Sequence, residues 1–280
     1  MEKQEKIEIQ IPDETVLGAR QLFPRNNPFL MMGDNLNHII EEMNLQVLAT
    51  SFDSNIITTL RLSLITAFQY IEILSDCQAS DAVRKRIDWK YALFLPFTHP
   101  GISKQNLSEF RQKLISSSAA LEEYSNFLLK LADLQFFSNL TDQLPEPKTF
   151  LSIICQINRV YILRKAMKTA LGLVVSLEPD WLVGQVSPHW FERYRSGYPE
   201  FNQPPSTIDI SSQAEKIGGD IYSLLVSIHH LNSLKINSSL EIKKLNFLFQ
   251  QQFYFMDESI YWRLPDCINC ICSDSFQEGG

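Results

Sequence analysis

Residues 60–114 read LRLSLITAFQYIEILSDCQASDAVRKRIDWKYALFLPFTHPGISKQNLSEFRQKL, and their pattern predicts three helices. In the first part of this stretch, apolar side chains recur three or four positions apart, as on one face of a helix. They are Leu60, Leu64, Ala67, Phe68, Ile71 and Leu74. Ser75 then precedes Gln78 by three residues, which is the spacing of a capping box. We therefore expect one helix over Leu60–Leu74 and a second, short helix over Asp76–Lys85.

A third helix is expected over Lys104–Ser116. Pro96, Pro100 and Gly101 are typical of a turn-rich connection before it, and Ser103 can cap its first turn. Its inward positions are Leu107, Phe110 and Leu114, and its outer face would carry Lys104, Gln105, Ser108, Arg111 and Gln112. A short capped helix, a connection and a helix with a polar, basic outer face indicate a helix-turn-helix-like arrangement.

The distribution of charge favours a nucleic-acid contact for this stretch. Residues 84–113 hold seven Lys or Arg and two acids, a local net charge of +5, whereas the whole chain carries −7. An acidic protein can still bind phosphates through one basic surface, because counterions are released locally at the contact. The predicted DNA contacts are Arg84, Lys85, Arg86, Lys104 and Arg111 at phosphates, and Gln105 and Ser108 at base edges. The alternative is a solvated helix face beside an ordinary three-helix core.

The amino-acid sequence of the same stretch resembles that of the N-terminal domain of bacterial insertion-sequence transposases of the InsH type. In that family a helix leads into an L-S-D-x-Q-A turn, an R-x-R-I-D-W-K-Y-A-L block and an L-S-x-F-R helix. The matching residues here are 74–79, 84–93 and 107–111. The resemblance implies a domain that binds double-stranded DNA at transposon ends.

Further motifs in the second half of the chain also resemble this family. Residues 188–194 match the family's P-x-W-x-x-R-Y, and residues 214–220 match its A-x-x-I-G-x-D. Asn158-Arg159 matches an N-R pair, and the segments ending at residues 255 and 263 resemble V-x-Q-Q-Y-Y and V-x-W-R. In the family, this helical block is inserted after the first catalytic strand.

Together these patterns predict an all-α fold with a helical, DNA-binding-like N-terminal domain and a second helical region. We expect an irregular segment over residues 1–35, the InsH-like helical domain over 36–140, and the insertion-like region over 141–280. The last region would end before the RNase H-like catalytic fold of the family. Further helices are expected over 115–140, Phe150–Leu177, Gln213–Leu231 and Leu240–Phe255.

The family's catalytic aspartate is the point at which this sequence departs from the resemblance. Aligned on Asn158-Arg159, that aspartate falls at Glu146, which stands between Pro145 and Pro147. Two prolines suit a loop better than a central strand, and two-metal phosphoryl transfer needs several convergent carboxylates. We therefore expect Glu146 to be a solvated loop residue, and we expect no catalytic residue, no metal, no cofactor and no enzyme activity.

A cysteine cluster near the end of the chain is a weak candidate for metal binding. Cys267, Cys270 and Cys272 could supply thiolates, but a structural zinc site needs four closed ligands. No further Cys or His lies nearby in sequence. The role of this cluster stays open.

Three functional hypotheses follow. The first is a transposase-derived DNA-binding protein, truncated or domesticated and catalytically inactive, which occupies transposon-end-like sites. The second is a helical protein-interaction subunit that pairs with a full-length transposase, with itself or with another partner. The third is half of an enzyme that a second reading frame completes. The charged N-terminus has no h-region and no run is long enough to span a membrane, so we expect no membrane partner; the resemblance implies the cytoplasm.

Overall fold

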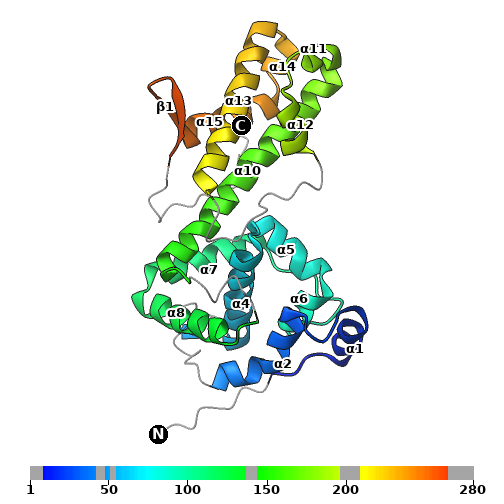
Figure 1. The fold of residues 1–280 in the computed structure, drawn as a ribbon, viewed down its shortest axis with the longest axis vertical. Helices are drawn as coiled ribbons and strands as arrows, with labels where there is room; N and C mark the ends of the chain where they lie inside the picture. Colours follow the sequence, from blue (N-terminus) through cyan, green and yellow to red (C-terminus); the bar gives the residue numbers. More distant parts are fainter. Residues whose placement is uncertain (1–8, 42–47, 51–54, 137–143, 196–208, 264–280) are drawn as a thin grey trace. The chain divides into compact units, whose positions relative to one another are not determined.

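The computed structural model describes residues 9–41, 48–50, 55–136, 144–195 and 209–263, and apart from one short hairpin their regular elements are all helices (Figure 1). The predicted all-α fold is confirmed. The chain divides into two compact units, with the division between Cys155 and Gln156 inside one long helix. The predicted division after residue 140 was too early, because Phe150, Leu151 and Ile154 belong to the core of the first unit.

The first unit is built from helices throughout. They are α1 (Asp13–Leu22), α2 (Pro28–Glu41), α4 (Ile56–Glu72), α5 (Asp76–Lys85), α6 (Ile87–Ala92), α7 (Lys104–Ser116), α8 (Ser118–Asp133) and the start of α10 (Pro147–Leu177). The expectation of an irregular segment over 1–35 is wrong. Asn27 accepts hydrogen bonds from the backbone N–H groups of Phe29 and Leu30 at 3.0 and 3.2 Å, so the Asn-Pro pair begins α2 instead of prolonging a loop.

The capping residues read from the sequence set the bounds of α5 and α7 as predicted. The Ser75 side chain accepts from the Gln78 N–H, and the Gln78 side chain accepts from the Ser75 N–H, which completes a capping box. Ser103 accepts from the Asn106 N–H at the start of α7. Between these helices the structure adds α6, which was not predicted. The arrangement is therefore not a two-helix turn, although α5 and α7 do pack against each other.

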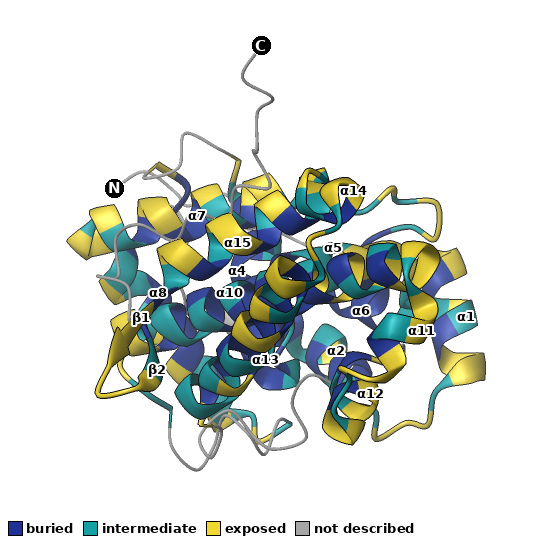
Figure 2. Cartoon of the chain, turned by 90° about the horizontal axis from the view of Figure 1, so that it is seen from above, coloured by how far each residue is buried: buried dark blue, intermediate teal, exposed yellow. Residues whose placement is uncertain are grey.

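Helix α4 lies at the centre of the first unit, and 12 of its 17 residues are buried; Figure 2 colours the chain by burial. Phe68 of α4 packs edge-on against the rings of Phe29 on α2 and Trp89 on α6, at ring-centroid distances of 4.9 and 5.1 Å. Tyr70 stacks on Phe150 of α10 at 4.3 Å. These aromatic contacts join four helices around one apolar core.

The second unit combines helices with a β-hairpin. It holds the rest of α10, then α11 (Pro179–Val183), α12 (Pro188–Tyr194), α13 (Ile210–Leu231), α14 (Leu234–Asn237), α15 (Leu240–Gln252), β1 (Phe253–Met256) and β2 (Ser259–Trp262). The predicted helix over Leu240–Phe255 ends earlier, because Phe253 is extended and pairs with Trp262. Asp257 and Glu258 both have positive φ, as in the two-residue turns that suit hairpins.

Among the described residues, no helix has by itself both the length and the apolar character needed to cross a membrane. Helices α4 and α5 pass that test as a pair, but they bend by 110° at the break between them.

Candidate nucleic-acid interface

Arg111 lies in the core of the first unit, so its predicted role as a phosphate contact is wrong. Its side chain is 2% exposed, and its two terminal nitrogens donate to the two carboxylate oxygens of Asp76 at 2.7 and 2.5 Å. Gln69 of α4 donates to the same carboxylate at 2.8 Å. Arg111 follows Leu107 by four positions and therefore shares the inward face of α7. The network fastens α7 to α5 and α4.

Arg86 is also engaged within the unit. It pairs with Asp88 at 2.6 Å and with Glu72, and its guanidinium lies over the rings of Phe29 and Trp89 at 5.2 Å. Burial lowers the pKa of Arg86, but the hydrogen bonds to Asp88 and Glu72 outweigh it and raise the pKa above its usual value. Because two carboxylates already balance its charge, Arg86 is a poor phosphate contact.

Arg84 and Lys85 remain on the surface at the end of α5. Both side chains are more than half exposed, and both pair with Asp81 one turn earlier, at 2.7 and 2.8 Å. The hydrogen bond from Lys85 and the charges of both cations lower the pKa of Asp81, which is also exposed. Such solvated pairs contribute little, so either cation can exchange Asp81 for a phosphate at small cost.

The first turns of α7 lie next to α5. The Ser80 hydroxyl of α5 donates to the Ile102 carbonyl at 2.5 Å. Gly101 has φ of +100°, and a Cβ there would lie 3.2 Å from the Cβ of Arg84. This close approach brings Lys104, which is half-exposed, to the side of α5 that bears Arg84.

Five of the seven predicted contacts therefore lie at the surface of α5 and α7. We call Arg84, Lys85, Lys104, Gln105 and Ser108 the α5–α7 edge. Gln105 is exposed, and Ser108 is half-exposed. The edge offers cationic and amide donors to an acidic ligand.

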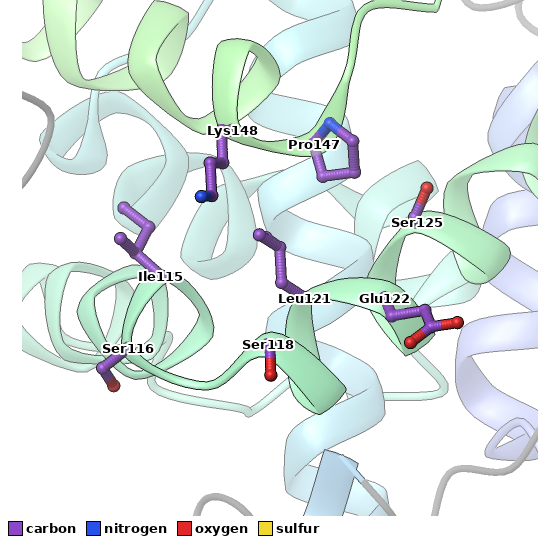
Figure 3. A pocket seen from close by; sticks show the side chains of 8 residues that line it. All are labelled: Ile115, Ser116, Ser118, Leu121, Glu122, Ser125, Pro147 and Lys148. Carbon is purple, nitrogen blue, oxygen red and sulfur yellow. The ribbon is translucent and has the colours of Figure 1, made fainter.

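The region around Glu146 shows no convergence of carboxylates among the described residues. Glu146 is exposed at the start of α10, and its carbonyl accepts from the Phe150 N–H at 2.9 Å. A pocket of about 560 Å³ lies between α7, α8 and α10, and Leu121 and Lys148 extend toward it in Figure 3. Glu122 is the carboxylate among its lining residues. Within the described ranges no group of three or more His, Cys, Asp or Glu is placed to hold a metal ion. Cys267, Cys270 and Cys272 lie outside these ranges.

In the second unit, residues of the matched motifs meet around Asp220. The Trp190 indole N–H donates to its carboxylate at 2.8 Å, the Tyr194 hydroxyl donates at 2.7 Å, and Arg193 pairs with it. Burial, followed by the charge of Asp220, raises the pKa of Tyr194. Trp190 is 5% exposed, so it packs inside the unit and its face is closed to a base.

Residues from separate segments also contact one another around Arg159. Arg159 donates to the Gln252 side chain at 2.9 Å and to the Arg263 carbonyl at 2.7 Å, and it lies 4.2 Å over the Trp262 ring. Burial lowers the pKa of Arg159 to about 10. These contacts hold the three segments together, and the exposed cations of α10 include Lys165 and Lys168.

Comparisons with known proteins add no relative to these observations. No family model matches the chain, and no curated protein and no solved structure is significantly similar to it.

Proposed function

We propose that this chain is a transposase-derived, catalytically inactive DNA-binding protein whose first unit holds duplex DNA through the α5–α7 edge. The observation that carries the proposal is the placement of exposed Arg84 and Lys85 beside the first turns of α7. Cations at such a position contact phosphates, which dominate the affinity of proteins for DNA. Gln105, exposed on the first turn of α7, can read adenine through its amide.

The resemblance to InsH-type transposases supports the same proposal. Its motif residues are far apart in sequence, yet they pair with one another: Asp76 with Arg111, and Trp190 with Asp220. A shared framework of this kind is what common descent would preserve. Such a protein would occupy transposon-end-like sites in the bacterial cytoplasm, alone or together with a full-length transposase.

Catalytic inactivity is the second part of the proposal. Glu146 stands exposed between two prolines, and the nearby pocket presents Glu122 as its carboxylate. Strand transfer needs carboxylates that converge on metal ions about 3.5–4 Å apart. We expect the purified protein to leave supercoiled plasmid intact in magnesium or manganese. Nicking that Glu146→Gln abolishes would overturn this part.

A titration of labelled duplex DNA at increasing salt tests the binding. We expect wild-type protein to bind at about 50 mM salt, and Arg84→Ala with Lys85→Ala to reduce the salt slope by about two units. Lys216→Ala with Lys235→Ala removes two exposed cations from the second unit and serves as the matched control. No binding by the wild type, or an equal loss in both double variants, would refute the proposal.

A helical interaction subunit is the second candidate, and a groove in the second unit favours it. The groove has a volume of about 540 Å³ between α13 and α15. Tyr222 and Phe255 line it and are 42% and 51% exposed, which is typical of a protein contact. Co-purification with a full-length InsH-type transposase, lost in Val226→Glu, would support this candidate. Equal recovery of wild type and variant would count against it.

A further inference from the structure

Three basic side chains in the first unit differ from the other cations packed there. Arg86 and Arg111 each pair with a carboxylate, and Arg20 pairs with Asp34 at 2.6 Å. Arg61, Lys90 and His99 have no carboxylate partner among the described residues. Arg61 and Lys90 bond to the loop of residues 93–99, which follows α6, and His99 is the last residue of that loop.

Arg61 and Lys90 both donate to main-chain oxygens, and the Arg61 guanidinium also lies 4.4 Å over the Phe94 ring. Arg61 donates to the carbonyls of Leu93 and Phe94, each at 3.2 Å. Lys90 is 5% exposed and donates to the Phe97 carbonyl. A guanidinium has five N–H donors and an ammonium has three, so both side chains keep donors that these carbonyls do not use.

His99 presents a further donor beside them. Its Nδ1 accepts from the Gly101 N–H at 3.2 Å, which places the proton of the neutral ring on Nε2. Burial, then the positive charges of Arg61 and Lys90, lower the pKa of His99. Burial also lowers the pKa of Arg61 and of Lys90. All three side chains therefore contact or belong to one loop, and among the described residues no carboxylate pairs with Arg61 or Lys90.

Arg61 and Lys90 are partly buried cations without a counter-charge, which is costly, and an anion would relieve that cost. We propose that Arg61, Lys90 and His99 bind a phosphate group, supplied by the backbone of DNA. The source of the phosphate rests on the proposed function, whereas the site itself does not. Arg61 and His99 are half-exposed and Lys90 is buried, so the ligand would reach the cluster from the surface. A phosphate oxygen can accept from each of three donors that approach from different sides.

The position of the cluster connects it to the α5–α7 edge. His99 bonds to Gly101, and Gly101 packs on Arg84. Residues 100–103 connect the loop that carries His99 to the first turn of α7. A duplex that lies along the α5–α7 edge would therefore place a neighbouring phosphate within reach of His99 and Arg61.

Thermal unfolding with inorganic phosphate, at constant ionic strength set with chloride, tests the site. We expect phosphate to raise the Tm of the wild type, and Arg61→Gln and His99→Gln to lose most of that rise. Arg25→Gln removes an exposed arginine from the same unit and should keep it. His99→Gln is included because Arg61 also holds two loop carbonyls, whereas the one hydrogen bond of the His99 ring among the described residues is to Gly101. No rise in the wild type, or the same rise in all variants, overturns the site.

Titration of duplex DNA separates this inference from the proposed function. Arg61→Gln should lower the salt slope by about one unit, and Arg25→Gln should leave it unchanged. If wild-type protein binds DNA through the α5–α7 edge and Arg61→Gln changes neither the slope nor the phosphate response, the inference fails and the function stands. If the wild type binds phosphate through Arg61 and His99 but does not bind DNA, the function fails and the site stands as one for free phosphate.

Discussion

Replacement of Arg111 should unfold the first unit before it changes DNA binding. Arg111 and Asp76 are 2% and 3% exposed and form a two-fold hydrogen-bonded pair. Arg111→Ala leaves the Asp76 carboxylate buried without its cationic partner, while the Gln69 amide still donates to it. Loss of one partner from a buried ion pair typically costs about 3–5 kcal/mol. With a slope of about 1–3 kcal/mol per molar urea, the urea midpoint of the first unit should fall by at least about 1 M.

Urea unfolding followed by circular dichroism measures this change. Arg84→Ala is the matched control, because its pair with Asp81 is more than half exposed and such pairs contribute about 0.2–1 kcal/mol. In a double-mutant cycle, Asp76→Ala with Arg111→Ala should cost clearly less than the sum of the single changes, because neither charge is then left alone. The reasoning is refuted if Arg111→Ala lowers the midpoint no more than Arg84→Ala. An unchanged midpoint with a reduced salt slope would return Arg111 to the DNA interface.

Three further outcomes are expected. Gly101→Ala should destabilise the first unit by about 1–2 kcal/mol in thermal unfolding, because φ of +100° disfavours a side chain and its Cβ would crowd Arg84; an unchanged Tm would contradict this. Asp220→Ala should destabilise the second unit by about 1–3 kcal/mol, since Trp190 and Tyr194 lose their acceptor; Glu192→Ala, an exposed acid on α12, is the control in urea unfolding. Because the pKa of His99 is lowered in the folded state, the unfolded chain binds more protons, so wild-type stability without phosphate should fall as pH drops below about 6.5; His99→Gln should flatten that fall, and an identical pH profile in both proteins would exclude the effect.

Local signals in the sequence were sufficient to predict where a helix starts if a side chain caps its first turn. Ser75 with Gln78, and Ser103, set the starts of α5 and α7 as predicted, since a cap acts within one turn. The residues of the α5–α7 edge were predicted to be exposed from the apolar periodicity of the same two helices. Arg111 was misplaced because a cation was assumed to face water, whereas its spacing from Leu107 and Leu114 puts it on the apolar face.

Features that depend on tertiary contacts could not be predicted. The counter-charge for Arg111 comes from Asp76, 35 positions earlier, and no local pattern pairs them. The Arg61, Lys90 and His99 cluster depends on how the loop of residues 93–99 folds back on α4. Helix α6 was missed because it is a short, six-residue helix, shorter than periodicity can reveal.

The order in which the ribosome delivers the chain gives the burial of α4 a further consequence. Tyr70 stacks on Phe150, so one face of α4 stays uncovered until 80 more residues have been made. At about 5–20 residues per second, that interval is on the order of 4–16 s. During it the nascent chain carries an apolar helix without its cover, because α7, α8 and α10 are still to come. The newborn protein should therefore depend on chaperones that shield apolar helices, and early termination before Phe150 should yield an aggregating fragment instead of a smaller folded unit.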